Sequence, residues 1–550
     1  MNTENLEKRG GKMRKVFLSV LVLCMLLIIN TWSAAESVLD LPDDLIRIES
    51  RAFSNIDADV VCFPSSVTYI ADDAFQGTNF SAIGEWGSYA ETWCRNKGIS
   101  FNTDSYLARQ YTWEETEEGG IEITGYTGER TSVIIPQTIN GKTVTELKKE
   151  VFKGQQIREI SFPSTITSIG AYAFENCTSL EKVMLSDAIT YIGRHAFRNC
   201  TALSSWNYPL HLEEIGSWQL IGEYGILNNC TSLKKITVPE GVTKLPGSIF
   251  EEATGLTEVN LPSTLTEIGS SAFYRCTSLK KANIPDSVTW IGMKAFKGCT
   301  ALTEWHYPEN LERVGWSLIE GTSGIFTDCT NLKTITVPNG ITTLPEYMFF
   351  GANCVEEIYL PSSLTAIPNG AFYDCVSLKK LSTLSLTNVV TVGGQAFRNC
   401  SSLERLELPD TVKEIGYYAF KDCKNLRYWK FPPSLQKTGT ASNNGYNFEG
   451  CESLTLISVP EGVTIIPRYC FLGSDYLKKV NLPSTLVLIE TGAFAHCGKL
   501  SSVSLPAGLQ KIETMAFQNC SSLTSITLPA GVILEGDPFD GCPVKDNLGL

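Results

Sequence analysis

Histidine is scarce in this chain, and its scarcity removes several kinds of chemistry. The 550 residues include four histidines, His195, His211, His306 and His496. None stands at metal-ligand spacing from another histidine or from a pair of cysteines. His496 adjoins Cys497, but that cysteine falls at a repeated position and is expected in a core, so it does not suggest a Cys–His nucleophile pair. We therefore expect no metal, no cofactor and no catalytic residues.

Other signatures of catalysis and of nucleic-acid binding are missing as well. The sequence has no phosphate-binding loop, no Rossmann fingerprint and no nucleophile elbow. Its 45 Lys and Arg stand against 59 Asp and Glu, which gives a formal net charge of −14. An acidic chain without a basic block is a poor partner for nucleic acid. These absences favour a non-enzymatic protein that does not bind nucleic acid.

An apolar run long enough to cross a membrane is also absent. The run Val16–Ile29 has 14 residues, fewer than the roughly 20 that a membrane-spanning helix needs. It follows a basic segment and precedes Ser33-Ala34-Ala35, whose small residues suit cleavage after Ala35. We predict that residues 1–35 are a signal peptide and that the protein is secreted or displayed at the cell surface. The alternative is an uncleaved N-terminal segment that anchors it.

What the chain does contain is one motif written many times. Ala-Phe-x-x-Cys stands at residues 173–177 and 196–200 and recurs, with variations, about every 23 residues. A fixed period of this length is typical of a solenoid, whose coils contact only their neighbours. The large apolar residue of this motif, usually Phe, is the anchor of each repeat. Three intervals between successive anchors, which we call steps, are longer than the rest: 197 to 227, 296 to 326, and 420 to 448.

Each repeat predicts two short strands and a turn. In one copy, Leu279–Pro285 alternates apolar and polar residues and predicts a strand that the proline ends. Val288–Gly292 predicts a second extended piece, closed by a glycine turn. Ala295–Cys299 has apolar residues four apart, which predicts a single helical or 3₁₀ turn. A lone coil cannot bury these residues, so stacked coils should form continuous internal columns of Leu, Ile, Phe and Cys.

Thirteen of the 18 cysteines recur at one point of the repeat, as Cys177 and Cys200 do. Neighbours in such a column lie about 4.8 Å apart, inside the roughly 4.4–6.8 Å that a disulfide allows between Cα atoms. Their side chains, however, point in parallel into the core. We therefore predict buried free thiols that pack as small hydrophobes, with bridged neighbours as the alternative.

The combined pattern, Leu-x-x-Ile-x-Leu-Pro and then Val-x-x-Ile-Gly-x-x-Ala-Phe-x-x-Cys, resembles the BspA-like class of leucine-rich repeats. The resemblance covers most of residues 38–550. It implies a strand-rich α/β leucine-rich-repeat solenoid, a right-handed curved superhelix with a parallel sheet on its concave side. It also implies a secreted or surface protein that, like many members, adheres to host or matrix proteins.

The chain divides into two predicted arrays. Residues 36–101 form a short array with a helical cap, because Ser88–Glu91 has the form of a capping box and Gly98 suits a helix end. Residues 99–101 could add a final edge strand. Acidic residues 102–120 suggest a linker, and residues 121–550 form the long solenoid.

The outward positions of the first strand offer the best candidate for binding. The residue between Ile and Leu points onto the concave face, and most of these residues are small and polar. The stretch from His306 to Lys430 is bulkier, and a solvated face without a partner is the alternative. As tentative binding residues for an extracellular protein or glycan, possibly host matrix, we name Asn283, His306, Tyr359, Glu407 and Lys430.

Each long coil begins with an aromatic strand. These strands are Trp206–Pro209, Trp305–Pro308 and Trp429–Pro432. The first two are 99 residues apart, which suggests that a four-coil block was duplicated. The aromatic residues could simply fill a wider coil. Alternatively, the inserted loops contact a ligand from one edge; the loops are Gly216–Gly225, Gly315–Gly324 and Gly439–Gly445.

Together these observations predict a monomeric, adhesin-like protein that binds through an extended face or through its inserted loops. The alternative is a structural component of a surface or matrix that self-associates.

Overall fold

Two compact units make up the chain in the computed structural model. The first comprises residues 1–151 and 156–166, and the second comprises residues 152–155 and 167–550. The structure describes residues 37–42, 44–64, 66–84, 88–102, 110–128, 130–215, 225–316, 324–382, 386–439 and 446–548. The predicted signal peptide and the interiors of the three inserted loops lie outside these residues. The domain boundaries expected at residues 101 and 120 stay predictions.

The first unit begins with a short array of coils that ends in a helix. Its strands are β1 (Val38–Asp40), β2 (Arg47–Ile48), β3 (Val60–Cys62), β4 (Tyr69–Ile70) and β5 (Ser81–Ile83). β1, β3 and β5 pair in parallel, as do β2 and β4. Helix α2 (Tyr89–Asn96) begins after Ser88, whose Oγ accepts a 3.1 Å hydrogen bond from Glu91 N. The predicted helix and its capping serine are therefore found. Phe101 makes only an isolated parallel bridge to Ala82, instead of the expected strand.

A second group of strands completes the first unit. The strands are β6 (Tyr111–Glu115), β7 (Ile121–Tyr126), β8 (Ser132–Ile134), β9 (Thr138–Ile139), β10 (Lys142–Leu147) and β11 (Glu159–Ser161). β6 pairs antiparallel with β7, so part of the stretch expected to be a linker is a strand. The reason is that Tyr111 is buried and its ring lies 5.2 Å from that of Tyr126. The acidic residues of β6, Glu114 and Glu115, are exposed beside this apolar contact.

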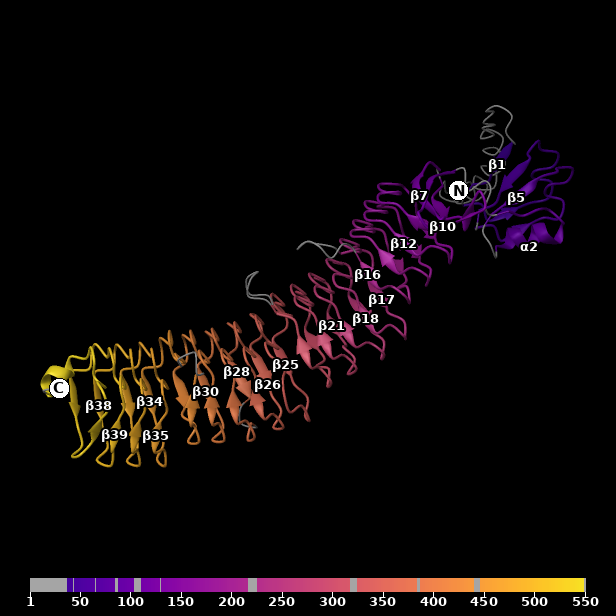
Figure 1. Ribbon diagram of the computed structural model, residues 1–550. Helices are drawn as coiled ribbons and strands as arrows, with labels where there is room; N and C mark the ends of the chain where they lie inside the picture. Colours follow the sequence, from indigo (N-terminus) through magenta and orange to yellow (C-terminus); the bar gives the residue numbers. More distant parts are fainter. Residues whose placement is uncertain are drawn as a thin grey trace, which may run out of the picture. The chain divides into compact units, whose positions relative to one another are not determined.

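The second unit is a stack of coils that follow one another in sequence order (Figure 1). Leu-x-x-Ile-x-Leu segments form a first ladder of parallel strands: β13 (Lys182–Met184), β15 (Ser205–Trp206), β17 (Lys235–Thr237), β19 (Glu258–Asn260), β21 (Lys281–Ala282), β23 (Glu304–Trp305), β25 (Thr334–Thr336), β26 (Glu357–Tyr359), β28 (Lys380–Ser382), β30 (Arg405–Glu407), β32 (Tyr428–Lys430), β34 (Leu456–Ser458), β36 (Lys479–Asn481), β38 (Ser502–Ser504) and β40 (Ser525–Thr527).

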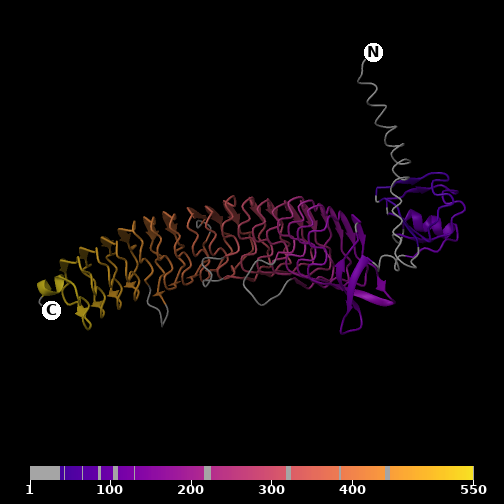
Figure 2. The ribbon, with the colours of Figure 1, turned by 90° about the horizontal axis from the view of Figure 1, so that it is seen from above.

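Val-x-x-Ile-Gly segments form a second ladder, which is also parallel. Its strands are β12 (Ser168–Ile169), β14 (Tyr191–Ile192), β16 (Glu214–Ile215), β18 (Lys244–Leu245), β20 (Glu267–Ile268), β22 (Trp290–Ile291), β24 (Arg313–Val314), β27 (Ala366–Ile367), β29 (Thr391–Val392), β31 (Glu414–Ile415), β33 (Lys437–Thr438), β35 (Ile465–Ile466), β37 (Leu488–Ile489), β39 (Lys511–Ile512) and β41 (Ile533–Leu534). A short helix, α3 (Val544–Leu548), follows the last strands. Figure 2 shows the same stack from above.

A column of stacked phenylalanines runs through the core of this unit. The rings of Phe273 and Phe296 lie 5.1 Å apart and nearly parallel, and both side chains are buried. The Ala-Phe-x-x-Cys segment is a turn, and the expected helical turn is not found. In most repeats the residues two before and two after the phenylalanine adopt left-handed backbone angles, such as Ser271 (φ 58°) and Arg275 (φ 53°), which no right-handed helix contains.

Asparagine suits this left-handed position, as expected for a turn residue. Asn176 and Asn199 have φ of 61° and 59°. Their side chains also link successive coils: Asn199 Nδ2 donates to Asn176 Oδ1 at 2.8 Å, and Asn229 Nδ2 donates to Asn199 Oδ1 at 2.9 Å. The Asn-Cys-Thr motifs thus form an asparagine ladder along the turn side of these coils.

The repeated cysteines are free and buried, as predicted. Each thiol also has a backbone partner, because Cys177 Sγ donates to Phe152 O at 3.0 Å and Cys299 Sγ donates to Phe273 O at 3.1 Å. Burial raises the pKa of Cys177 to about 12, so its thiol stays protonated and can donate. Cysteine therefore serves here both as a small apolar residue and as a hydrogen-bond donor between coils.

Candidate binding surface

The outward column of the first ladder points to solvent, as the alternation predicts. Asn283 and His306 are exposed, while Tyr359, Glu407 and Lys430 are half-buried. These five residues are placed on one face by the same register. In that register Thr336 pairs with Tyr359, and Glu407 pairs with Lys430 on the neighbouring strand. The structure therefore brings Glu407 and Lys430 side by side, whereas Asn283 and His306 lie several coils away along the stack.

His306 is held by an acidic neighbour from the preceding coil. Its Nε2 lies 3.0 Å from Asp286 Oδ1, and both side chains are about half exposed. The same carboxylate accepts a 3.1 Å hydrogen bond from Glu309 N. The hydrogen bond from His306 and then that from Glu309 hold the pKa of Asp286 below its ordinary value. The sequence does not reveal this pair, because Asp286 lies in the turn after β21 and not in the strand itself.

Tyr359 is oriented by contacts within its own face. Its hydroxyl donates a 2.5 Å hydrogen bond to Glu357 Oε2, two residues earlier on β26. Lys380 Nζ lies 5.6 Å from the ring centroid. The hydrogen bond to Glu357 raises the pKa of Tyr359 above its ordinary value. The aromatic ring is therefore half-exposed but held in place, which lowers the entropy lost when a partner covers it.

Glu407 and Lys430 belong to a compact group of side chains on β30 and β32. Arg405 forms an ion pair with Glu407 on its own strand. Lys430 Nζ lies 2.8 Å from Asp410 Oδ1, and this hydrogen bond raises the pKa of Lys430. Both predicted residues thus have charged partners in the free protein.

Sequence reasoning missed the aromatic and aliphatic members of this group. Tyr428 is 42% exposed, and the guanidinium carbon of Arg405 lies 4.0 Å from its ring centroid. In the following coil, Leu456 on β34 is 46% exposed. Both occupy the other outward position of the first strand, one residue before the buried Ile position. Reading that second outward column for large apolar residues would have found them.

Charged side chains alternate in sign along the first ladder between residues 235 and 304. Lys235 Nζ lies 2.7 Å from Glu258 Oε1, and Lys281 Nζ lies 3.0 Å from Glu304 Oε2. All four side chains are more than half exposed, so each pair contributes at most about 1 kcal/mol. This part of the face is a regular charged surface, and it lacks the aromatic groups found between residues 357 and 430.

The aromatic strands that precede the long steps fill the core, as the simpler interpretation proposed. Their side chains are at most 8% exposed: Trp206, Tyr208, Trp305, Tyr307, Trp429 and Phe431. The inserted loops that were considered as an alternative site have interiors at 216–224, 317–323 and 440–445, which lie outside the described residues. They stay a prediction.

The described residues contain little that suggests reaction chemistry. Among them, no group of three or more His, Cys, Asp or Glu side chains could hold a metal ion. A shallow hollow of about 320 Å³ lies on the turn side, with Lys297, Asp328, Asn353, Asp374 and Asn399 in its lining. The search for long apolar helices over the same residues finds none that could span a membrane.

The two parallel ladders, the Phe–Cys column and the period of about 23 residues define a leucine-rich-repeat solenoid. A family model described as "BspA type Leucine rich repeat region (6 copies)" matches residues 33–88, 126–223, 219–325, 322–445 and 442–546. The chain therefore belongs to the BspA-type leucine-rich repeat family, and the resemblance seen in its sequence is confirmed.

Several solved bacterial structures are similar to the chain. A leucine-rich repeat protein from Bacteroides ovatus ATCC 8483 is 24% identical, with a TM-score of 0.38, over 79% of this chain and 91% of that one. A leucine rich cell surface protein from Faecalibacterium prausnitzii A2-165 is 25% identical, with a TM-score of 0.32, over 76% and 92%. The pneumococcal vaccine antigen PcpA is 16% identical, with a TM-score of 0.32, over 78% and 96%. No curated protein matches the chain.

Proposed function

We propose that this protein is secreted or surface-exposed and that it binds an extracellular protein or glycan, such as one of host matrix, without catalysing a reaction. The binding surface is the first-ladder face between β26 and β32. Asn283 and His306 would contact only a partner long enough to extend toward the preceding coils. The protein acts as a monomer in this proposal.

The observation that carries the proposal is the change in the outward residues along one ladder. Between residues 235 and 304 they are charged pairs and small amides. Between residues 357 and 430 they include Tyr359 and Tyr428, each contacted by a cation at 5.6 and 4.0 Å. Rigid aromatic residues with charged neighbours are typical of interface hot spots. Packing does not require them, because the outward positions of other coils hold Thr, Asn and Ser.

A pull-down from mucosal or matrix extracts tests the proposal with a double variant. Tyr359→Ser with Lys430→Ser should preserve the fold, since both side chains are outward, and should reduce capture of any partner about tenfold or more. The matched control is Glu414→Ser with Lys437→Ser, which removes an exposed pair 3.7 Å apart on the second ladder of the same coils. Unchanged capture by the first variant would refute this choice of face, as would equal loss with the control.

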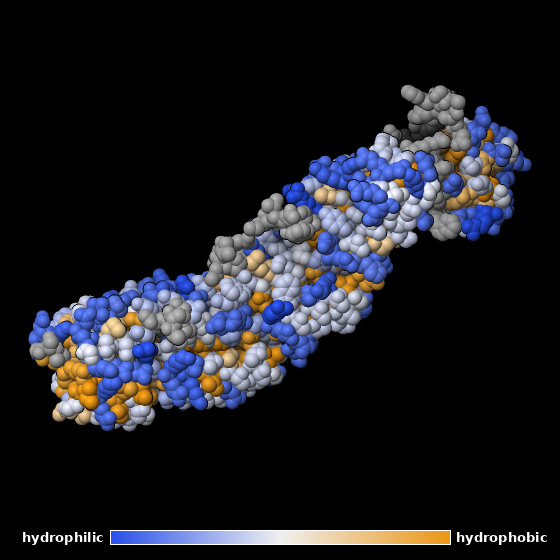
Figure 3. Space-filling view, in the orientation of Figure 1, coloured by the Kyte–Doolittle hydropathy of each residue, from blue (hydrophilic) through white to orange (hydrophobic). Residues whose placement is uncertain are grey.

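The second candidate is a structural component that self-associates, and one observation favours it. The second ladder carries exposed aliphatic side chains near the C-terminal end of the unit, Ile465 (41% exposed) and Ile533 (62%). On the side seen in Figure 3, hydrophobic atoms are visible at this end among hydrophilic ones. Light scattering after size-exclusion chromatography separates the two candidates, because the binding proposal expects a monomer.

A further inference from the structure

Three coils of the second unit interrupt both ladders at once. The first ladder stops after β15, β23 and β32, and the second stops after β16, β24 and β33. Each stop coincides with one of the long steps. The first ladder is also interrupted between β19 and β21, between β28 and β30 and between β36 and β38, but at these three places the second ladder continues. Within the described residues of this unit, both ladders are lost only at these three places, which we call the 206, 305 and 429 joints after their tryptophans.

An ordinary interface between coils shows what the joints lack. Between the coils of β20 and β22, Thr289 N donates to Thr266 O at 2.9 Å and Gly292 N donates to Ile268 O at 2.7 Å. On the turn side of the same interface, Phe273 N donates to Ala295 O at 2.8 Å. Backbone hydrogen bonds thus connect these coils on both the second-ladder side and the turn side.

At the joints the connection remains mainly on the turn side. At the 206 joint, Asn229 N donates to Glu252 O at 2.9 Å. At the 305 joint, Asp328 N donates to Asn353 Oδ1 at 2.9 Å, and Asn353 Nδ2 donates to Asp328 Oδ1 at 2.9 Å. The ladder side has no strand pairing across these two joints in the described residues. Each joint is therefore fastened along one edge.

The 429 joint is closed chiefly by aromatic packing. The rings of Phe431 and Phe448 lie 6.2 and 5.9 Å from that of Phe471 in the next coil. Three polar contacts also cross it: Thr438 Oγ1 donates to Arg468 O at 2.6 Å, Ser453 N donates to Lys424 O at 3.0 Å, and Lys424 Nζ lies 3.3 Å from Glu452 Oε1. Apolar contacts of this kind are not directional, so they permit small rotations that a strand ladder resists.

The joints also contain buried polar atoms that have no partner within the protein. At the first two joints these are the indole nitrogen and the tyrosine hydroxyl of one strand; at the third only the indole nitrogen remains, since Phe431 replaces the tyrosine. The atoms are Trp206 Nε1, Tyr208 Oη, Trp305 Nε1, Tyr307 Oη and Trp429 Nε1. A buried polar group without a protein partner weakens the packing around it, whether it stays unpaired or draws a water into the coil.

We propose that the three wide coils are hinge joints, at which the second unit bends and opens on its ladder side and which divide it into four separately cooperative blocks. Stability in a stack of coils is a sum of coil terms and neighbour interfaces, so opening concentrates where the interfaces are weakest. Here three observations coincide: both ladders stop at every joint, the bonds given for the first two joints lie on the turn side, and each joint buries at least one polar atom without a protein partner. The inference does not depend on what the protein binds.

Native-state hydrogen exchange of the full chain under mild denaturant tests the proposal. Backbone amides of the strands that border the joints should exchange before amides in the middle of the blocks, with steps in protection near residues 206, 305 and 429. The double variant Tyr208→Phe with Tyr307→Phe gives the first two joints the phenylalanine that the third joint has as Phe431. This variant should slow opening at the first two joints by about fivefold to tenfold, and opening at the 429 joint should not change.

Tyr274→Phe is the matched control, because its half-buried hydroxyl lies within a block, and it should leave every rate unchanged. One protection level throughout the blocks and joints would overturn the proposal. Faster opening of the double variant would overturn it too, since the tyrosine hydroxyls would then strengthen the joints.

Discussion

The second ladder carries mainly charged side chains in the block β18–β24 and mainly aliphatic ones in the block β35–β41, with Trp290 and Lys511 as the exceptions. In the first block, Lys244 Nζ lies 3.0 Å from Glu267 Oε1. In the second, the equivalent outward positions include Ile465, Leu488 and Ile533. The core beneath is the same, because phenylalanine rings stack at 5.1 Å in one block and 5.2 Å in the other. The repeat thus fixes its interior and leaves its outer face free to vary.

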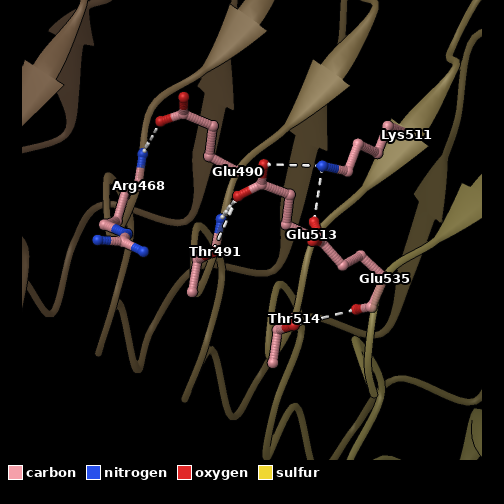
Figure 4. Close-up of polar contacts among 7 residues, drawn as sticks. All are labelled: Arg468, Glu490, Thr491, Lys511, Glu513, Thr514 and Glu535. Carbon is pink, nitrogen blue, oxygen red and sulfur yellow. Dashed lines mark hydrogen bonds and ion pairs between the residues drawn. The ribbon is translucent and has the colours of Figure 1, made fainter.

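The same two blocks also join their coils differently. In the first, a Cβ atom on Gly292 would lie 2.3 Å from Ser270 N, so only glycine allows this approach of neighbouring backbones. In the second, glutamates take that place (Figure 4). Glu490 Oε2 accepts a 2.8 Å hydrogen bond from Arg468 N, and Glu513 Oε2 accepts one of 3.1 Å from Thr491 N. One position of the repeat therefore serves either close backbone packing or a carboxylate bridge.

The largest effect should come from the feature that the blocks share. Phe296→Ala and Phe494→Ala should each destabilise their own coils by about 3–5 kcal/mol, because each leaves a cavity in the ring column. Hydrogen exchange of the two variants measures this block by block, and the damage should reach adjacent coils first. If either variant lost protection evenly over all coils, the interior would be one cooperative core rather than a stack.

The glycine position should be sensitive only where backbones touch. Gly292→Ala should destabilise the first block by about 1–3 kcal/mol through overpacking, as measured by denaturant unfolding. Gly498→Ala is the control, because its added Cβ would meet only Ser521 Oγ at 3.7 Å. Equal effects of the two substitutions would mean that close approach is not the reason for the glycine.

The carboxylate bridge should make the last block sensitive to acid. Burial raises the pKa of Glu513, but hydrogen bonds from Thr491 and the contact with Lys511 outweigh it and hold this pKa below its ordinary value. Such a group stabilises the fold above its unfolded pKa of about 4.3, and the contribution is lost as the pH falls through the folded value. Glu513→Gln should cost about 1–2 kcal/mol at neutral pH and flatten the acid dependence of exchange in residues 465–534. An unchanged acid dependence would contradict this.

The cysteine column should behave alike in both blocks. Cys299→Ala and Cys520→Ala each remove a thiol that donates to a phenylalanine carbonyl at 3.1 Å, and each should cost about 1 kcal/mol. Alanine already stands at this point of the repeat at Ala253, so the fold accepts it. Alkylation under denaturing, non-reducing conditions should modify most repeated cysteines, whereas bridged neighbours such as Cys177 and Cys200 would reverse this expectation.

The smallest change in stability should come from the outer face. Ile465→Thr with Ile533→Thr should alter the free energy of unfolding by less than about 0.5 kcal/mol, because both side chains are largely exposed. The same variant is informative about association. If the wild-type chain forms oligomers and the variant does not, the aliphatic face is the contact between copies and the structural alternative gains support.

Most of the repeat could be predicted from the sequence, because the period of its apolar residues indicates which side chains are buried. The alternation in Leu279–Pro285 sets the strand and its outward column, and the apolar anchor sets the core. The turn was misjudged, because apolar residues four apart also suit a helical turn. The deciding signal was the Asn, Asp or Gly two residues after most of the phenylalanines, which favours left-handed backbone angles.

Other features depended on distant partners that spacing does not reveal. β6 was expected to belong to a linker because of its glutamates, yet Tyr111 packs on Tyr126 from the next strand. The acidic neighbour of His306, Asp286, lies in a turn of the preceding coil. The joints could not be foreseen either: the long steps are visible in the sequence, but the loss of both ladders follows only from pairing.

The spacing of the joints bears on how such a chain changes length. The first two wide coils each end with a strand in both ladders and a large apolar anchor, which is Leu227 in one and Phe326 in the other. Unequal recombination between two copies of the Trp-x-Tyr-Pro strand, 99 residues apart, would therefore add or remove one whole block without creating a new kind of interface. The reach of the molecule can then evolve in steps of four coils, while selection on surface residues proceeds independently in each.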